Sequence, residues 1–387
     1  MAETKIVKSF FYFLIIIGFF LGIGKALAHP MPNSVLQLKI KEAYVLGELK
    51  SPYIEYQNAL SKKFIDLNTL PTYYLKHIKA SSNTNQWQTK IDTIYIQNDS
   101  IPNFGTYQEI IVKFKLIPVS LTDIRYFTLN FDVITHQVIN HQIMVVLCED
   151  WINGVLNDNK TPLLLGTIKY ALETDKISPL TIHLEKGSVW KGFKSFCIMG
   201  INHIIHGLDH IFFIVLLLLI APVRNEGKKW SLFQGNTYTF KRFLSISLFF
   251  TLGHSFSLFL GTFNLIPFEI GYIEVFITIT IILTAIHTIK PIFPSKETMV
   301  GLIFGTIHGL AFSESISSLD LTFKPKLISM LGFNLGIEIA QIGIILIVFP
   351  LLLFSKYKIY HTFRFWFALT TILLSMFWFY NRIQFLF

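Results

Sequence analysis

The chain has little charge and almost no cysteine. Charged residues make up 15% of its 387 residues, whereas 52% are hydrophobic and the mean hydropathy is +0.52. These values exclude an ordinary soluble protein and predict an integral membrane protein. The two cysteines, Cys148 and Cys197, offer neither a disulfide framework nor a CxxC metal site. The net charge of +9 comes without a long basic block, so we expect no nucleic-acid partner.

The first 190 residues divide into a leader and a strand-rich segment. Residues 1–28 combine a basic start with an apolar run and end in Ala26-Leu27-Ala28, which predicts a signal peptide cleaved before His29. An uncleaved anchor is the alternative, and it too would export the strand-rich segment. Residues 29–190 contain short segments of alternating apolar and polar residues separated by turn-rich patches. They predict an extracytoplasmic, all-β, sandwich-like domain.

Residues 191–387 are predicted to form a six-span transmembrane domain. Each apolar run approaches or exceeds the roughly 20 residues that cross a bilayer. The runs lie at 197–222, 242–264, 269–290, 298–316, 327–353 and 362–380. Basic residues gather in the loops 223–241, 291–297 and 354–361, which we therefore expect to be cytoplasmic. The predicted fold is a polytopic α-helical membrane protein, a six-helix bundle preceded by an exported β domain, with its carboxyl terminus outside the cytoplasm.

The first span carries four side chains that are costly in a bilayer, namely His203, His206, Asp209 and His210. On one continuous helix, an advance of about 100° per residue places the three histidines within roughly 60° of one another. Because contact with lipid would be costly, we expect these groups to face the bundle interior and to be functional. The alternative is a set of interhelical hydrogen bonds that holds the bundle together.

Other spans carry polar groups at compatible depths, so we expect them to share one cavity in the outer half of the bilayer. The predicted metal ligands are His203, His206, Asp209, His210, His254, His308 and Glu338. The predicted supporting residues are Ser255, Glu274, Asn334 and Gln341. His287 lies nearer the cytoplasmic end of the third span, so we expect it to be structural or to lie on an exit path.

Imidazole and carboxylate groups together are the ligand set of first-row divalent metals. A transport site must also release its ion, so a site without a closed thiolate cage is chemically reasonable. The residues therefore predict a bound divalent transition metal, either nickel, zinc, copper or cobalt.

Four motifs in order resemble the HupE/UreJ family. They are Gly200, His203, Gly207, Asp209, His210 and Phe213 in the first span, then Phe250-Thr251-Leu252-Gly253-His254-Ser255, His308-Gly309-Leu310-Ala311-Phe312 and Phe333-Asn334-Leu335-Gly336-Ile337-Glu338-Ile339-Ala340-Gln341. The family is associated with hydrogenase and urease accessory functions, and its members are described as candidate permeases for nickel or related metals. The resemblance implies metal-handling roles for His203, Asp209, His210, His254, His308 and Glu338. The chain differs in having His287 and a large N-terminal domain.

The leading hypothesis is a metal permease in the bacterial inner membrane, surrounded by lipid. Its β domain would capture or deliver ions, or dock a periplasmic partner. The second hypothesis is an intramembrane zinc-dependent hydrolase, with three histidine ligands and with Asp209 or Glu338 as general base. A nucleophilic Ser255 beside His254 is a poorer candidate, because neighbours on a helix point about 100° apart. In a third reading, the spans only anchor the β domain.

Overall fold

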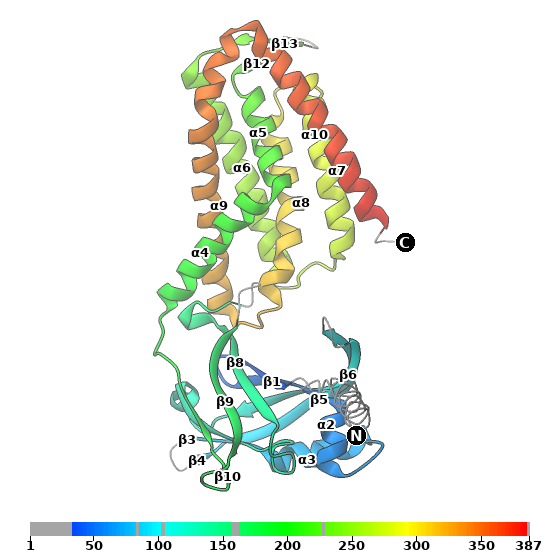
Figure 1. Cartoon of the computed structure of the whole chain (residues 1–387). Coiled ribbons are helices and arrows are strands. Elements are labelled where there is room, and N and C mark those ends of the chain that lie inside the picture. Colours follow the sequence, from blue (N-terminus) through cyan, green and yellow to red (C-terminus); the bar gives the residue numbers. More distant parts are fainter. Residues whose placement is uncertain (1–32, 83–84, 102–104, 157–161, 227–228, 385–387) are drawn as a thin grey trace, which may run out of the picture.

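The computed structural model describes residues 33–82, 85–101, 105–156, 162–226 and 229–384. The predicted signal peptide, residues 1–28, lies outside the described residues. Within the described part, a β-rich N-terminal region is followed by a helical region (Figure 1).

Two sheets form the β-rich region. Its strands are β1 Ser34–Ile40, β2 Val45–Pro52, β3 Ile78–Ser82, β4 Asn85–Gln86, β5 Gln88–Ile101, β6 Gly105–Ile117, β7 Tyr126–Phe131, β8 Gln142–Asp150, β9 Leu163–Ala171, β10 Lys176–Ile177 and β11 Leu180–His183. The seven-stranded sheet has the order β10-β9-β8-β1-β2-β6-β5, and the four-stranded sheet has the order β11-β7-β3-β4. β1 pairs in parallel with β8 and antiparallel with β2.

Buried and half-buried side chains alternate along strands of this region. Along β1, every second residue is buried, as expected for a strand with one face on a core. Leu38 of one sheet and Phe127 and Leu129 of the other belong to the same apolar core, so the two sheets pack face to face. The prediction of a β-rich region is confirmed.

The prediction that this region is all-β is wrong in one respect, because it also contains two helices. They are α2 Tyr53–Leu60 and α3 Leu70–His77. In α3, Leu70, Tyr74 and His77 are buried at the spacing of one helix face, and Pro71 lies in the first turn, where its missing N–H costs nothing. Tyr56 and Tyr74 join the core of the sheets.

The helical region contains α4 Val189–His206, α5 Leu208–Ile220, α6 Asn236–Thr262, α7 Ile270–Ile289, α8 Glu297–Ser317, α9 Phe323–Leu352 and α10 Lys358–Gln384. Five of these helices, α6 to α10, are long and apolar enough to cross a membrane. The expectation that the first span is one continuous helix is wrong. α4 and α5 meet at a bend of 73°, and they make a sixth span only if the bent pair is counted as one.

Glycines let two helix pairs pack closely. A Cβ on Gly305 of α8 would lie 2.0 Å from the Phe250 carbonyl oxygen of α6, and one on Gly309 would lie 2.2 Å from the His254 carbonyl oxygen. A Cβ on Gly200 of α4 would likewise lie 2.2 Å from the Phe333 carbonyl oxygen of α9. Small residues at such crossings bring helix backbones together. Here they bring α6 against α8, which carry His254 and His308, and α4, which carries His203, against α9.

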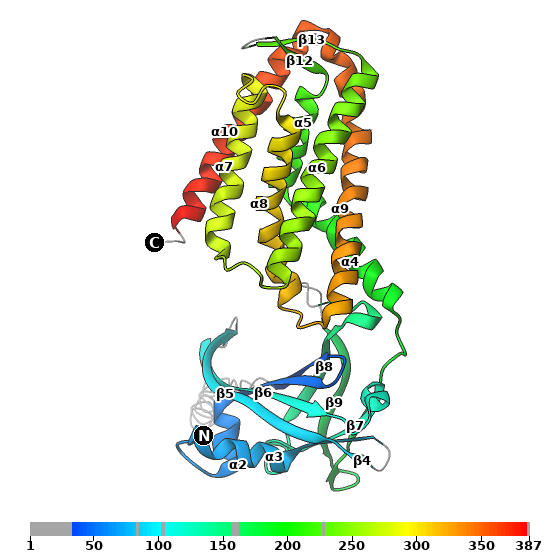
Figure 2. The same cartoon turned by 180° about the vertical axis from the view of Figure 1, so that it is seen from behind.

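The two ends of the helical region differ. The β-rich region lies at one end, and the hairpin of β12 Val223–Glu226 and β13 Lys229–Phe233 lies at the other (Figures 1 and 2). At the hairpin end, Arg242 donates to Glu297 Oε1 at 2.7 Å and to the carbonyl oxygens of Ile220 and Val223. This basic end is the one whose loops are predicted to be cytoplasmic.

Polar contacts join the β-rich region to the link between α8 and α9. The β1–β2 turn supplies Tyr44, whose hydroxyl donates to Asp320 Oδ2 at 2.7 Å, and Glu42, which accepts from Thr322 Oγ1 at 2.7 Å. Burial and the Asp320 carboxylate raise the pKa of Tyr44 to about 12, so its hydroxyl keeps the proton that it donates. These contacts fix the β-rich region against the end of α8, the helix that carries His308.

Candidate metal centre

A break in the first span shapes the candidate site. α4 ends at His206, Gly207 adopts an extended conformation, and α5 begins at Leu208. A Cβ on Gly207 would lie 2.6 Å from the His203 carbonyl oxygen and 2.8 Å from His210 Nδ1. Only glycine leaves room for the backbone to turn this close to both histidines. The turn also puts Asp209 in the first turn of α5, where the helix dipole stabilises a carboxylate.

Three side chains from two helices form the centre of the site. Donor atoms of Asp209, His210 and His308 all lie within 4.8 Å of one another. Donor atoms around one zinc ion each lie about 2 Å from the metal. Small side-chain movements would therefore bring the three groups onto one ion.

Neighbouring groups determine which ring nitrogens are free. His210 Nδ1 lies 3.0 Å from Asp209 Oδ1, and because an ionised carboxylate only accepts, this nitrogen carries the proton. Thr280 Oγ1 of α7 donates to the Ile277 carbonyl oxygen at 2.7 Å and therefore accepts from His308 Nε2 at 3.2 Å. In the neutral rings, His210 Nε2 and His308 Nδ1 then hold lone pairs, and both are buried without a hydrogen-bond partner. These two atoms are free to bind a metal.

Two more histidines extend the group. The ring of His203 lies 4.5 Å from that of His210, centroid to centroid, and the His210 ring lies 5.1 Å from that of His308. His254 is fully buried, and both of its ring nitrogens lack a partner, as does His203 Nε2. Four helices, α4, α5, α6 and α8, thus present imidazole nitrogens in one place that have no partner among the described residues.

Aromatic rings enclose this group. Phe213 and Phe250 lie 5.6 and 5.5 Å from the His308 ring, and Phe312 lies 4.7 Å from the His203 ring. Phe312 itself stacks on Phe333 at 3.9 Å. This apolar surround offers the histidine nitrogens few polar partners, and an unpaired buried polar group is costly.

Two predicted ligands lie outside the group. His206 is exposed, and its Nδ1 contacts the Asn202 carbonyl oxygen one turn earlier, at 3.0 Å. The break at Gly207 turns it away from the face on which a continuous helix would have placed it. Glu338 is half-buried on α9 and makes no hydrogen bond or ion pair with any described residue. Neither side chain belongs to the three-residue group of Asp209, His210 and His308.

The four predicted supporting residues have different surroundings. Asn334 lies beside His254, and its Oδ1 is buried and unpaired. Gln341 accepts from Ser247 Oγ at 2.7 Å and so joins α9 to α6. Glu274 lies 3.8 Å from Arg382. Ser255 is half-buried, and within the described structure it makes no hydrogen bond to His254, so these two residues form no nucleophile–base pair.

His287 belongs to a separate cluster at the hairpin end of the helical region. Its Nδ1 accepts from the backbone N–H groups of Ile292 and Phe293 at 3.0 and 3.2 Å. Its Nε2 lies 3.7 Å from Glu297, which pairs with Arg242. The backbone bonds give His287 a structural part in the turn after α7.

Sequence reasoning missed Thr280 and the part that Gly207 plays. Threonine is common on helices and often bonds its own backbone, so nothing in the sequence marked Thr280 as the partner of His308. The signal at Gly207 was available, because a glycine between His206 and Asp209 is a natural point for a helix to break.

The class of protein follows from these observations. Exposed apolar residues run along one face of α6 at Leu244, Leu248, Leu252 and Phe256, as expected for a helix in contact with lipid. The molecule is a multi-pass membrane protein with buried histidines and an aspartate inside its helical region.

A family model described as HupE / UreJ protein matches residues 180–382, which is more than half of the chain. The chain therefore belongs to the HupE/UreJ family, which confirms the resemblance seen in its motifs. The match covers all of α4 to α9 and nearly all of α10, and it excludes most of the β-rich region. Neither the curated proteins nor the solved structures contain a match to this chain. Family membership connects the helical region with metal-related membrane function.

Proposed function

We propose that the protein is a permease for a divalent transition metal, which binds at His203, Asp209, His210, His254 and His308. One observation carries the proposal. Five buried imidazole nitrogens on four histidines have no hydrogen-bond partner among the residues that the structure describes, and all four rings lie in one neighbourhood with the Asp209 carboxylate. Unpaired buried polar groups cost folding free energy, and a metal ion would recover that cost.

The ion is the transported substrate in this proposal, not a resident cofactor. Nitrogen donors with one carboxylate suit nickel, cobalt, zinc or copper. The absence of a thiolate from the group favours release, because soft sulfur ligands hold such metals tightly. Asp209 both orients His210 and supplies the negative charge that a divalent ion requires.

The arrangement of the chain supports a topology for this permease. We place residues 1–28 as a cleaved signal peptide, 29–190 as an extracytoplasmic domain and 191–387 as a bundle of six spans, in which α4 and α5 make the first. The bacterial inner membrane is the proposed location. The basic loops then face the cytoplasm, and the break at Gly207 opens toward the extracytoplasmic side.

Metal binding and uptake with matched histidine variants test the function. The purified protein in lipid nanodiscs is titrated with nickel, cobalt, zinc and copper, and proteoliposomes are assayed for uptake of the metal that binds best. His210→Ala should weaken binding by about 100-fold or more, since even residues that orient a ligand change metal affinity by about 10–100-fold. His206→Ala removes the same side chain one turn away and should leave binding unchanged. Equal affinity in both variants contradicts the site, and binding without uptake contradicts the permease.

A further inference from the structure

A second candidate site lies in the β-rich region, far from the histidines. A pocket of about 460 Å³ lies between residues of the two sheets. The elements α3, β3 and β10, which line it, lie at the end of the β-rich region away from the helices (Figure 1). The lining of the pocket comes from α3, β3, the end of β7 and the β9–β10 hairpin. Pockets of about 300–1,000 Å³ hold small molecules, so this one is large enough for a metabolite.

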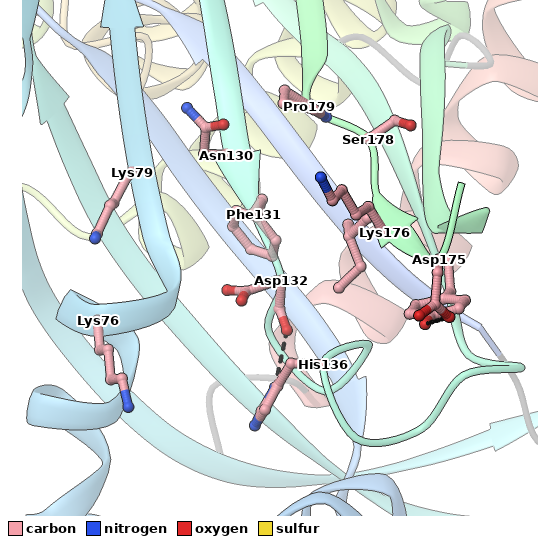
Figure 3. A pocket seen from close by; sticks show the side chains of 12 residues that line it. Lys76, Lys79, Asn130, Phe131, Asp132, His136, Asp175, Lys176, Ser178 and Pro179 are labelled. Atoms are coloured by element: carbon pink, nitrogen blue, oxygen red, sulfur yellow. Dashed lines mark hydrogen bonds between the residues drawn. The ribbon is translucent and has the colours of Figure 1, made fainter. Parts of the chain in front are cut away.

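Three lysines stand around the pocket without partners. Lys76 ends α3, Lys79 lies in β3 and Lys176 begins β10, and none makes an ion pair or hydrogen bond with any residue that the structure describes. Figure 3 shows Lys76 and Lys79 on one side of the pocket and Lys176 on the other. Asn130 pairs with Lys79 across the β3–β7 ladder and adds an amide at the same rim.

The pocket's own carboxylates form no ion pair with these lysines, because each has a different hydrogen-bond partner. Asp132 accepts from His77 Nδ1 at 2.8 Å, and Asp175 accepts from the Tyr170 hydroxyl. His136 donates through Nδ1 to the Asp132 carbonyl oxygen at 3.0 Å (Figure 3). Burial lowers the pKa of His136, so its ring adds no positive charge at neutral pH. The lining therefore carries three unpaired ammonium groups and two carboxylates, which leaves an excess of positive charge for an anionic ligand.

The distribution of these groups selects the kind of ligand. Because Lys76 and Lys79 stand on one side of the pocket and Lys176 on the other (Figure 3), a ligand with negative groups at both ends would meet lysines on both sides. Phe131 is buried, and Ile177 and Pro179 add further apolar surface to the lining. Such a lining suits a carbon skeleton that carries several negative groups.

We propose that this pocket binds a small organic polyanion of the di- or tricarboxylate class through Lys76, Lys79 and Lys176. The proposal does not depend on the metal site, because it uses only residues of the β-rich region. It gives that region a role as the receptor for an anionic metabolite.

Calorimetry on the full-length protein tests this proposal. The metal-free protein in nanodiscs of neutral lipid is titrated at low ionic strength with tricarballylate, a tricarboxylate, and separately with acetate and with inorganic phosphate. We expect tricarballylate to bind, and acetate and phosphate to bind at least about tenfold more weakly. Raising the salt concentration should weaken binding, since exposed charges are screened.

Matched variants locate the ligand. The double variant Lys79→Gln with Lys176→Gln should weaken tricarballylate binding by about tenfold, because it removes two exposed charge pairs, each of which contributes modestly. The control is Lys90→Gln with Lys169→Gln, which changes the charge equally at two exposed lysines outside the pocket. No binding of tricarballylate at millimolar concentration, equal binding of phosphate, or an equal loss in the control overturns the proposal. None of these results would affect metal binding at the histidines.

Discussion

The β-rich and helical regions treat buried polar groups differently. In the β-rich region, Lys41 and Glu149 lie 2.7 Å apart with side-chain exposures of 6% and 2%, and Arg125 forms a two-bond pair with Asp150. In the helical region, His254 and His308 are as deeply buried, yet ring nitrogens of both have no partner. One region pairs its buried charges, whereas the other leaves a group of imidazoles open.

The helical region is nevertheless able to pair buried groups. At its hairpin end, the buried Glu297 has Arg242 at 2.7 Å, and two backbone N–H groups occupy His287 Nδ1. Among the described residues, unpaired imidazole nitrogens are therefore concentrated in one place, although His287 Nε2 also lacks a hydrogen bond. Because an unsatisfied buried polar group costs about 1–3 kcal/mol, such a concentration supports the proposed binding site.

The largest effect is expected where a paired charge is broken. Lys41→Met would leave the Glu149 carboxylate buried without its cation, and such a loss costs about 3–5 kcal/mol. Lys41 also donates to the Leu319 carbonyl oxygen, so the contact with the helical region would weaken as well. Hydrogen exchange across β1 and β8 should report the loss.

Two further variants sharpen this test. Lys90→Met removes an exposed lysine of β5 and should change exchange little. Adding Glu149→Met to Lys41→Met should restore much of the stability, since replacing both partners by apolar groups is often tolerated. A loss below about 1 kcal/mol in the single variant would contradict the view that the β-rich region depends on its buried pair.

The next largest effect is expected in the pH dependence of the folding stability of the β-rich region. Burial lowers the pKa of His141 to about 4, and its Nε2 lies 2.7 Å from Ser34 Oγ. In the unfolded chain a histidine titrates near pH 6.5. The stability that neutral His141 contributes is therefore present above pH 6.5 and is lost as the pH falls toward 4, by about 3 kcal/mol in total.

Comparison of two histidine variants shows how much of the pH dependence comes from His141. The pH dependence of hydrogen exchange in β1 and β8 should become shallower between pH 6.5 and 4 in His141→Gln. It should stay unchanged in His183→Gln, which alters an exposed histidine of β11. Identical slopes in His141→Gln and the unaltered protein would show that His141 does not titrate in this range on folding.

A smaller effect on stability is expected when a glycine at a helix crossing in the helical region is replaced by alanine. In Gly305→Ala, the new Cβ would meet the Phe250 carbonyl oxygen, so α6 and α8 must separate, at a cost of about 1–3 kcal/mol. Gly343→Ala in α9 adds the same methyl group where no atom lies within 4 Å, and it should be neutral or stabilising. Thermal unfolding in detergent measures both, and metal affinity should fall only in Gly305→Ala because His254 and His308 lie on the separated helices.

The sequence identified most residues of the candidate site but not how they are arranged. His203, Asp209, His210, His254 and His308 stood out because such side chains are costly in a bilayer, whatever the exact path of the helix. The assumption of a continuous helix then placed His206 with them. A break at a single glycine reverses that placement, because two half-helices at 73° no longer share one face.

In the β-rich region, alternation of apolar and polar residues predicted strands in general, whereas a polar edge strand gave no such signal. β1 and β6 follow the period of two, whereas β5 runs to Ile101 through Gln97-Asn98-Asp99-Ser100, which reads as a turn. β5 is an edge strand whose far part is exposed, so pairing with β6 holds it in place and its own side chains give little signal. Polar edge strands are difficult to identify for this reason.

The smallest expected effect concerns the group that orients an open nitrogen. Thr280 and Thr278 both donate to a backbone carbonyl three residues earlier on α7, but only Thr280 also contacts His308. Thr280→Val should therefore weaken metal binding by about tenfold, since it frees Nε2 and lets the ring change its tautomer. Thr278→Val removes an equivalent hydroxyl and should leave the affinity unchanged. If both variants bind metal equally well, Thr280 does not determine the tautomer of His308. The assignment of His308 Nδ1 as the metal-binding atom would then be contradicted.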